Sequence, residues 1–206
     1  MRKFKYNGVE IEVPEKAPAF THSVPMMLAS FGRIEDNHNI PYFEKLMQYK
    51  ETDLPEGELL HDVCALNSIR HLNYQVNNGG FEQYFDNGYH QYRAGYEIGD
   101  LALLAIDEQI KFLKVLIDFI LLDDCKAKYK DELLKALMLF ECQRINIIEY
   151  ENYEPDNEGD YTILDGCDAF DRQWYKVNEV IEMGIELYAQ YLCKRLEVAC
   201  NGSANK

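Results

Sequence analysis

The chain has 206 residues, and 47% of them are hydrophobic, which is enough for one domain with a sizeable buried core. Its 36 acidic residues against 21 basic ones give a net charge of −15, which disfavours direct binding to nucleic acid or to an anionic membrane surface. No secretory leader and no apolar run of membrane-spanning length are evident, and the six scattered cysteines are typical of a reducing compartment. We therefore expect a cytoplasmic protein.

Residues 2–13 are predicted to form a β-hairpin. Aromatic residues alternate with lysines before Asn7-Gly8, a strong turn signal, and β-branched residues alternate with glutamates after it. The opposite charges of the two strands are expected to pair across the ladder. Two strands alone are marginally stable, so the hairpin must pack on the chain or pair with a second one. Residues 1–50 are expected to hold this hairpin, an irregular proline-containing extension and a short helix at about 41–50.

Residues 51–200 are predicted to be a helical domain, followed by a disordered tail at 201–206. After an acidic loop at 51–57, apolar residues recur every three or four positions, as they do on the buried face of a helix. The spacing predicts helices at about 58–76, 92–105, 108–122, 131–150 and 170–199. Asp107 is the expected N-cap of the third, Leu134 and Met138 are expected to point inward from the fourth, and Gly202 is expected to end the last. The fold class is therefore mainly α: a single-domain bundle of about six to eight helices with a small N-terminal β-hairpin.

Residues 74–88 hold the densest group of turn-forming residues in the chain. The asparagines and glycines at 77–80 can adopt positive φ at low cost, and so can Asn87-Gly88. The aromatic residues between them share one face of a helical turn. We interpret this stretch as a break between helices whose polar side chains bond unpaired backbone groups; the alternative is a binding site. The motif consists of Asn77, Asn78, Gly79, Gly80, Phe81, Gln83, Tyr84, Phe85 and Asn87.

This motif resembles the central motif of a bacterial family of helical domains of unknown function, which includes a DNA mimic protein from Neisseria that is acidic, helical and dimeric. A second, weaker match is Leu164-Asp165 followed by Phe170-Asp171 and Trp174-Tyr175. Family sequences there carry Asp-x-x-Phe-Tyr, so Trp174 stands where Phe is usual and the spacing is longer. The resemblance covers about residues 60–175 and leaves out the first 50. It implies the fold more directly than the activity, because the motif contains no surface acids.

The acidic residues are clustered. Residues 149–171 hold nine acids and no Lys or Arg, a net of −9, and a second cluster lies at 51–62. Carboxylates on a fixed scaffold can imitate phosphates, which follow one another about every 3.4 Å along a DNA strand. We predict that these acids occupy the DNA site of a basic DNA-binding protein, such as a transcription factor or a nucleoid protein; the alternative is that they only confer solubility. The predicted surface consists of Glu149, Glu151, Glu154, Asp156, Glu158, Asp160, Asp165, Asp168, Glu51, Asp53, Glu56 and Glu58.

Other functions have weaker support in the sequence. Residues 154–165 loosely follow a calcium-binding EF-hand loop, but with Glu at position one, Pro at position two and Asp at position twelve. A metal-binding or hydrolytic enzyme using this loop is the alternative from another class, and an uncharacterised helical interaction domain is a further one. His61 and Cys64 share a helical face but lack two further zinc ligands. Without a catalytic constellation we predict no enzyme and no cofactor, and the free edge of the hairpin allows a homodimer.

Overall fold

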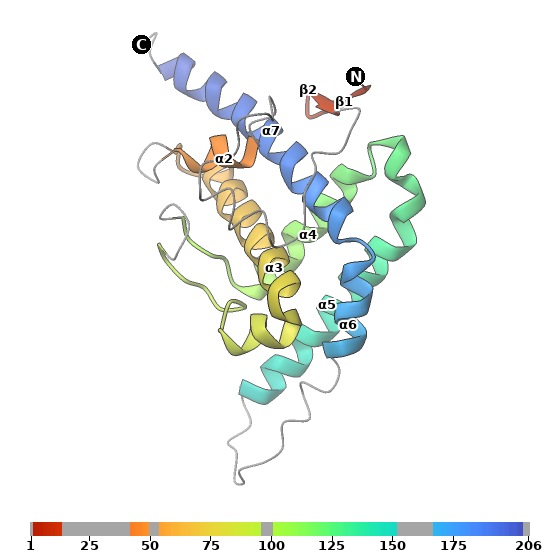
Figure 1. The fold of residues 1–206 in the computed structure, drawn as a ribbon. Coiled ribbons are helices and arrows are strands. Elements are labelled where there is room, and N and C mark those ends of the chain that lie inside the picture. The colour runs from red at the N-terminus through yellow and green to blue at the C-terminus, as the bar shows by residue number, and fades with distance from the viewer. Residues whose placement is uncertain (1, 14–41, 50–53, 96–100, 152–166, 204–206) are drawn as a thin grey trace, which may run out of the picture.

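A computed structural model of the chain describes residues 2–13, 42–49, 54–95, 101–151 and 167–203, without the side chains of 145–151 and 201–203. In these ranges the mainly α class with an N-terminal hairpin is confirmed (Figure 1). The elements are β1 (Arg2–Tyr6), β2 (Val9–Val13), α2 (Tyr42–Met47), α3 (Glu58–Asp86), α4 (Ile106–Ile120), the 3-10 helix η2 (Asp124–Tyr129), α5 (Lys130–Glu151), α6 (Cys167–Tyr175) and α7 (Asn178–Ser203).

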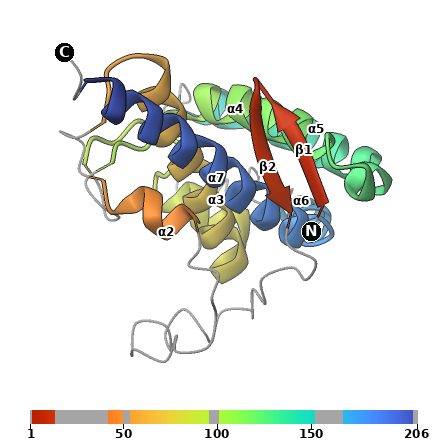
Figure 2. The same ribbon diagram turned by 90° about the horizontal axis from the view of Figure 1, so that it is seen from above.

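Helix α7 organises the core. It contacts α2, α3, α4 and β2, while α5 and α6 pack at the lower end of the molecule (Figures 1 and 2). Leu66 of α3, Leu116 of α4 and Leu192 of α7 are fully buried where these helices meet. No helix in the described part of the chain is long and apolar enough to cross a membrane.

The predicted hairpin is confirmed. Asn7 and Gly8 have φ values of 46° and 80°, as expected for a two-residue turn in which both central residues have positive φ. The strands pair with Lys3 opposite Glu12. The Lys3 ammonium lies 2.7 Å from a carboxylate oxygen of Glu10 and 3.3 Å from one of Glu12, so the predicted cross-strand charge pairing is present.

The hairpin packs on α4 and α7 through its aromatic face. The Tyr6 ring makes edge-to-face contacts with Phe119 of α4, at 5.1 Å between centroids, and with Tyr191 of α7, at 5.0 Å. Figure 2 shows the hairpin lying beside these helices. This packing supplies the support that two isolated strands lack.

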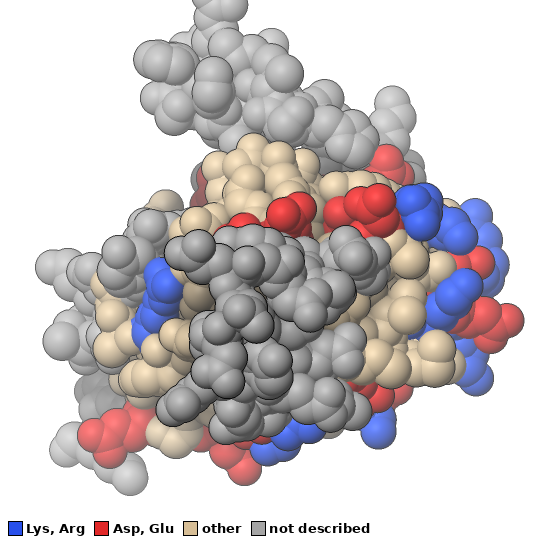
Figure 3. Space-filling view, turned by 90° about the horizontal axis from the view of Figure 1, so that it is seen from below, with Lys and Arg blue, Asp and Glu red and all other residues tan. Residues whose placement is uncertain are grey.

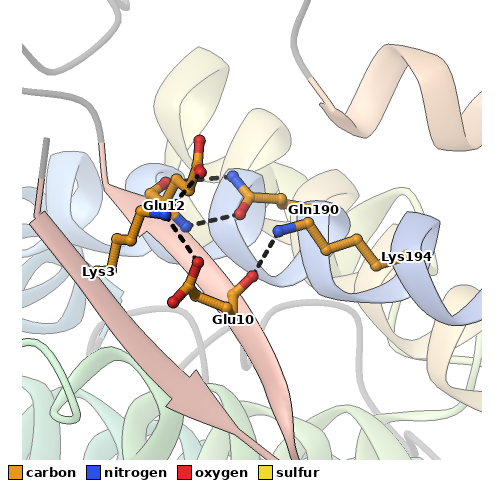
Figure 4. A network of polar contacts seen from close by, with 5 residues as sticks. All are labelled: Lys3, Glu10, Glu12, Gln190 and Lys194. Atoms are coloured by element: carbon orange, nitrogen blue, oxygen red, sulfur yellow. Dashed lines mark hydrogen bonds and ion pairs between the residues drawn. The ribbon is translucent and has the colours of Figure 1, made fainter.

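Side chains of α7 also bond the outer edge of β2 (Figure 4). The Glu12 main-chain N–H donates to Gln190 Oε1 at 2.8 Å, and Gln190 Nε2 donates to the Glu12 carbonyl at 3.1 Å. Lys194 donates to the Glu10 carbonyl. The expectation of an unsatisfied hairpin edge is therefore wrong for β2, because α7 takes the place of a third strand there.

The helix predicted at 92–105 is wrong. The described residues 89–95 and 101–105 are not helical, and Arg93 and Leu103 form an isolated β-bridge. Leu101 and Leu103 are buried while the residues beside them are only partly so, which is the alternation of an extended segment. The Leu104 N–H donates to Ser68 Oγ of α3 at 2.8 Å, so α3 holds this segment in place.

Two details of the later helices also differ from the prediction. Helix α4 begins at Ile106, one residue before Asp107, and its cap position makes no side-chain hydrogen bond; Asp107 instead forms an ion pair with Arg144 of α5. On α5, Leu134 and Met138 are 41% and 53% exposed, because the inward face is centred on neighbouring positions such as Phe140.

The predicted last helix is two helices. Helix α6 ends at Tyr175, and α7 begins at Asn178, whose side-chain Oδ1 accepts a hydrogen bond from the Glu179 N–H at 2.7 Å. This bond joins adjacent residues, so it is not the usual N-cap contact, which reaches the second or third N–H of the helix. Helix α7 then continues to Ser203, past Gly202.

Gly184 allows α7 to approach α4 closely. A Cβ at this position would collide with the side chain of Ile120, both at its Cδ1 and its Cγ1 atoms. We expect Gly184→Val to lower the free energy of unfolding by about 2 kcal/mol, because overpacking forces the helices apart. Cys200→Val, on the exposed side of α7, is the matched control and is expected to change it by less than about 0.5 kcal/mol in urea unfolding. Equal stabilities of the two variants would contradict close packing at Gly184.

Candidate functional site

The break predicted at 77–80 is a kink inside α3. Gly79 has φ −157° and ψ 21°, and Gly80 has φ 78° and ψ −177°. Of the four residues expected to be free to adopt positive φ, only Gly80 does so. Its backbone lies in a region that is almost exclusive to glycine. The kink therefore depends on this one residue.

Asp171 of α6 lies against the kink. Its Oδ1 atom accepts a hydrogen bond from the Phe81 main-chain N–H at 2.8 Å. It thereby caps the second half of α3, whose first N–H groups have lost their partners in the preceding turn. A Cβ on Gly80 would collide with the same carboxylate. Burial raises the pKa of Asp171, and the hydrogen bond from Phe81 opposes that rise.

Other polar contacts tie the first half of α3 to α6 and α7. The Tyr175 hydroxyl donates to the Val76 carbonyl at 3.0 Å, and Asn178 Nδ2 donates to Asn77 Oδ1 at 2.9 Å. Backbone groups at the break are thus bonded by side chains of α6. The expectation that Asn77 or Gln83 would bond these backbone groups is wrong. The described partner of Asn77 is the Asn178 side chain, and that of Gln83 is the Gln75 side chain.

Aromatic packing joins the two motifs that carry the family resemblance. The Phe81 ring lies 3.6 Å from that of Phe170 and 5.5 Å from that of Trp174, measured between centroids. Trp174 is fully buried, and its Nε1 donates to Asn73 Oδ1 at 2.7 Å. Segments about ninety residues apart in the chain therefore form one junction. Each motif is the packing partner of the other.

The second half of α3 holds the extended segment that follows it. Tyr84 is fully buried and its hydroxyl contacts both the Tyr89 carbonyl, at 3.0 Å, and Gln109 Oε1, at 2.6 Å. Phe85 is also buried, whereas Asn87 is exposed at the helix end and its carbonyl accepts from Arg93. Most of the motif is thus engaged in internal contacts, and among its members Asn78, Gly79 and Asn87 are exposed.

Four carboxylates gather around this junction. Glu82 and Asp86 come from the second half of α3, and Asp168 and Asp171 come from α6; we call these four residues the basal acidic face. Burial raises the pKa of the Cys167 thiol to about 11, and all four carboxylates add to that rise. Figure 3 shows this end of the molecule, with acidic side chains above the centre of the view and both acidic and basic ones at its margins.

Sequence reasoning missed Glu82 and Asp86 as members of an acidic cluster. They lie more than eighty residues before Asp168 in the chain, and only the kink at Gly80 turns them toward α6. The signal that could have found them was the pairing of the two motifs, since a contact between Phe81 and Phe170 brings their neighbours together as well.

A second acidic group lies at the start of α3. Glu58 is the first residue of the helix, and burial raises the pKa of Asp62 one turn later, with a further contribution from Glu58. His61 links this acidic group to α4, because its Nε2 atom lies 3.4 Å from the carboxylate of Glu108. Lys111 also pairs with Glu108, at 2.5 Å, so this end is less uniformly negative than the basal acidic face.

Much of the acidic surface predicted from the sequence lies outside the described side chains. Glu56, Glu58 and Asp168 are described, at the two ends of α3. The loop 154–165, with its calcium hypothesis, lies outside the described residues. Within the described part of the chain no group of three His, Cys, Asp or Glu side chains is arranged to hold a metal ion. The other predicted members of the acidic surface, whose side chains lie outside the described ones, are Glu149, Glu151, Glu154, Asp156, Glu158, Asp160, Asp165, Glu51 and Asp53.

The fold and its junction define an acidic, mainly α-helical domain in which the long helix α3 is kinked. The chain belongs to the DMP19-like protein family, which matches residues 57–195. The match includes the kink, the basal acidic face and most of α7, and it leaves the hairpin and α2 outside. No curated protein and no solved structure matches the chain.

Proposed function

We propose that the protein acts as a DNA-mimic-type binding protein, which occupies the DNA site of a basic DNA-binding protein such as a transcription factor or a nucleoid protein. The observation that supports this most directly is the basal acidic face, in which two helices present Glu82, Asp86, Asp168 and Asp171 together. The net charge of −15 and the resemblance to a family that includes a DNA mimic support it as well.

Three carboxylates of the basal acidic face, Glu82, Asp86 and Asp168, are exposed and have their charge available for a partner, while Asp171 caps the kink. Among the described side chains, none of the four forms an ion pair, whereas Asp107, Glu108 and Glu197 all do. A mimic of a phosphate backbone needs negative charges that are not already neutralised, because the attraction between partner and DNA arises from phosphate charge and counterion release.

The length of α3 also fits a DNA-like surface. At a rise of about 1.5 Å per residue, the stretch from Glu58 to Asn78 is about 30 Å long, which corresponds to about nine phosphate steps of 3.4 Å. The acidic group at Glu58 therefore lies at one end of a stretch about as long as one turn of duplex, and the kink that positions Glu82 and Asp86 follows its other end. Helices fix the backbone positions of such charges, so only the side chains have to be ordered on binding.

A charge-matched pair of variants tests this function. The triple variant Glu82→Gln, Asp86→Asn and Asp168→Asn keeps Asp171 and the kink; the control Asp118→Asn, Asp131→Asn and Glu141→Gln removes equal charge from exposed positions of α4 and α5. Each protein is immobilised, and DNA-binding proteins captured from a bacterial lysate are quantified. We expect capture to fall by at least about tenfold for the basal variant and far less for the control.

Salt dependence and the loop acids provide two further arms of this experiment. Capture by the unaltered chain is expected to fall steeply between about 50 and 200 mM salt, as for phosphate contacts. Changing Glu154, Asp156, Glu158 and Asp160 to lysine is expected to abolish it. The proposal would be contradicted if the amount captured did not change with salt concentration, or if only neutral and acidic proteins were recovered.

We also propose that the protein forms a homodimer, because the family that it resembles includes a dimeric DNA mimic. This part of the proposal no longer rests on β2, whose outer edge is bonded by Gln190 and Lys194. Sedimentation equilibrium at several protein concentrations distinguishes a dimer from a monomer, and a monomer at all concentrations would remove this part.

A further inference from the structure

Helix α2 is a short clasp lying against α7 and, through Phe43, against α3. Its residues Phe43 and Leu46 are buried. At its polar edge Lys45 pairs with Glu197 of α7 at 2.6 Å. The Arg70 guanidinium of α3 lies over the Phe43 ring, 4.8 Å from its centroid. Because α2 has only six residues, it depends on these contacts rather than on its own helical stability.

One buried carboxylate holds the N-terminal end of α2. The Tyr42 N–H donates to Glu186 Oε1, and the Phe43 N–H donates to Glu186 Oε2 at 3.3 Å. The Glu186 residue is only 8% exposed. Further along α7, the Cys193 thiol contacts the Tyr42 carbonyl at 3.6 Å. The same acid therefore caps α2 and is covered by it.

The charges around Glu186 do not compensate for its burial. The charge of Arg70 acts on Glu186, but the two form no ion pair among the described contacts, and the Nη1 atom of Arg70 is buried without a hydrogen-bond partner among the described residues. Burial raises the pKa of Glu186 to about 7; the N–H groups of Tyr42 and Phe43 and the charge of Arg70 oppose the rise, and Glu44 adds to it. The charged and titratable groups that face this site are Glu44 and Tyr42 from α2, Arg70 from α3, and Glu182 and Cys193 from α7.

We propose that α2 is a proton-coupled clasp, which is closed on α3 and α7 while Glu186 carries a proton and loosens when Glu186 ionises. In the closed state α2 keeps water from the carboxylate, so ionisation favours the open state in which water can reach it. Opening exposes Arg70 and the apolar surface beneath Phe43 and Leu46. Helix α2 lies outside the residues that the DMP19-like family matches, whereas Glu186 and Arg70 lie inside them, so the clasp joins the N-terminal part of this chain to the family domain and uses no residue of the basal acidic face.

Amide hydrogen exchange of the full chain tests the clasp. Exchange of the amides in 42–47 is measured at pH 5.5 and pH 8, corrected for intrinsic rates, with the amides of α4 as the internal reference. We expect the protection of α2 to fall by roughly tenfold or more on going to pH 8, while α4 changes little. In Glu186→Gln, which cannot ionise, the α2 protection is expected to be the same at both pH values. Glu44→Gln, which removes a carboxylate that adds to the rise in the pKa of Glu186, is expected to keep the same direction of change with a smaller loss of α2 protection at pH 8.

Two results would overturn the proposal. One is α2 protection in the unaltered chain that does not change between the two pH values. The other is a Glu186→Gln variant that loses α2 protection at pH 8 as the unaltered chain does. If Glu186→Gln fails to fold, the unaltered chain and Glu44→Gln still decide the matter, because the pH dependence of α2 relative to α4 is measured on both.

Discussion

Gly80→Ala is expected to lower the free energy of unfolding by about 3 kcal/mol. Alanine at φ 78° and ψ −177° is strained by about 1–3 kcal/mol. Its Cβ would also displace the Asp171 carboxylate, so the Phe81 N–H would lose its partner at a cost of about 1 kcal/mol or more. Urea unfolding followed by circular dichroism measures the loss.

Gly79→Ala is the matched control for this prediction. The φ of Gly79 is −157°, which any residue adopts, and a Cβ there meets only the side chain of Gln83. We expect a loss of less than about 1 kcal/mol, since Gln83 can change rotamer. If Gly79→Ala were as damaging as Gly80→Ala, the special backbone of Gly80 would not be what fixes the kink.

Stability is expected to fall by about 3 kcal/mol as the pH rises from about 4.5 to above 7, through Glu186 alone. Its pKa is raised from 4.5 to about 7 in the folded chain, so the folded state holds this proton more tightly than the unfolded state does. The contribution is fully present below the unfolded pKa and is lost as the pH rises through the folded pKa. Opening of α2 relieves part of the penalty, so 3 kcal/mol is the upper end.

Glu186→Gln isolates this contribution from that of the other acids. Burial also raises the pKa of Asp62 and Asp171, whereas ion pairs lower the pKa of Asp107 and Glu108. The difference in unfolding free energy between the two proteins, measured by urea unfolding across this pH range, is expected to follow the titration of one group near pH 7. A difference that stays constant with pH would show that Glu186 does not titrate in this range.

Local signals in the sequence were sufficient for the hairpin and for most helices. Asn7-Gly8 defines the turn by itself, and the start of α3 at Glu58 follows from the apolar spacing after Gly57. The segment 101–105 was predicted wrongly because Leu101 and Leu103 are apolar and buried in an extended backbone, where helical spacing is irrelevant. The division between α6 and α7 has neither glycine nor proline to mark it and is stabilised by Asn178.

The site was predictable in part. The break at 77–80 could be located from its glycines, but its partner could not be derived from spacing, because Asp171 reaches it only through the packing of Phe81 on Phe170. The same contact turns Glu82 and Asp86 toward α6. Glu186 gave no signal at all: in the sequence it is one acid among 36, and only its burial under α2 makes it unusual.

The proposed function requires that the acidic surface and duplex DNA compete for one site on a basic partner. The most direct test is to saturate the immobilised chain with a captured DNA-binding protein and then to add a short duplex at constant ionic strength. We predict that the duplex releases the partner and that no complex holds all three components. A ternary complex of chain, partner and DNA would contradict the claim.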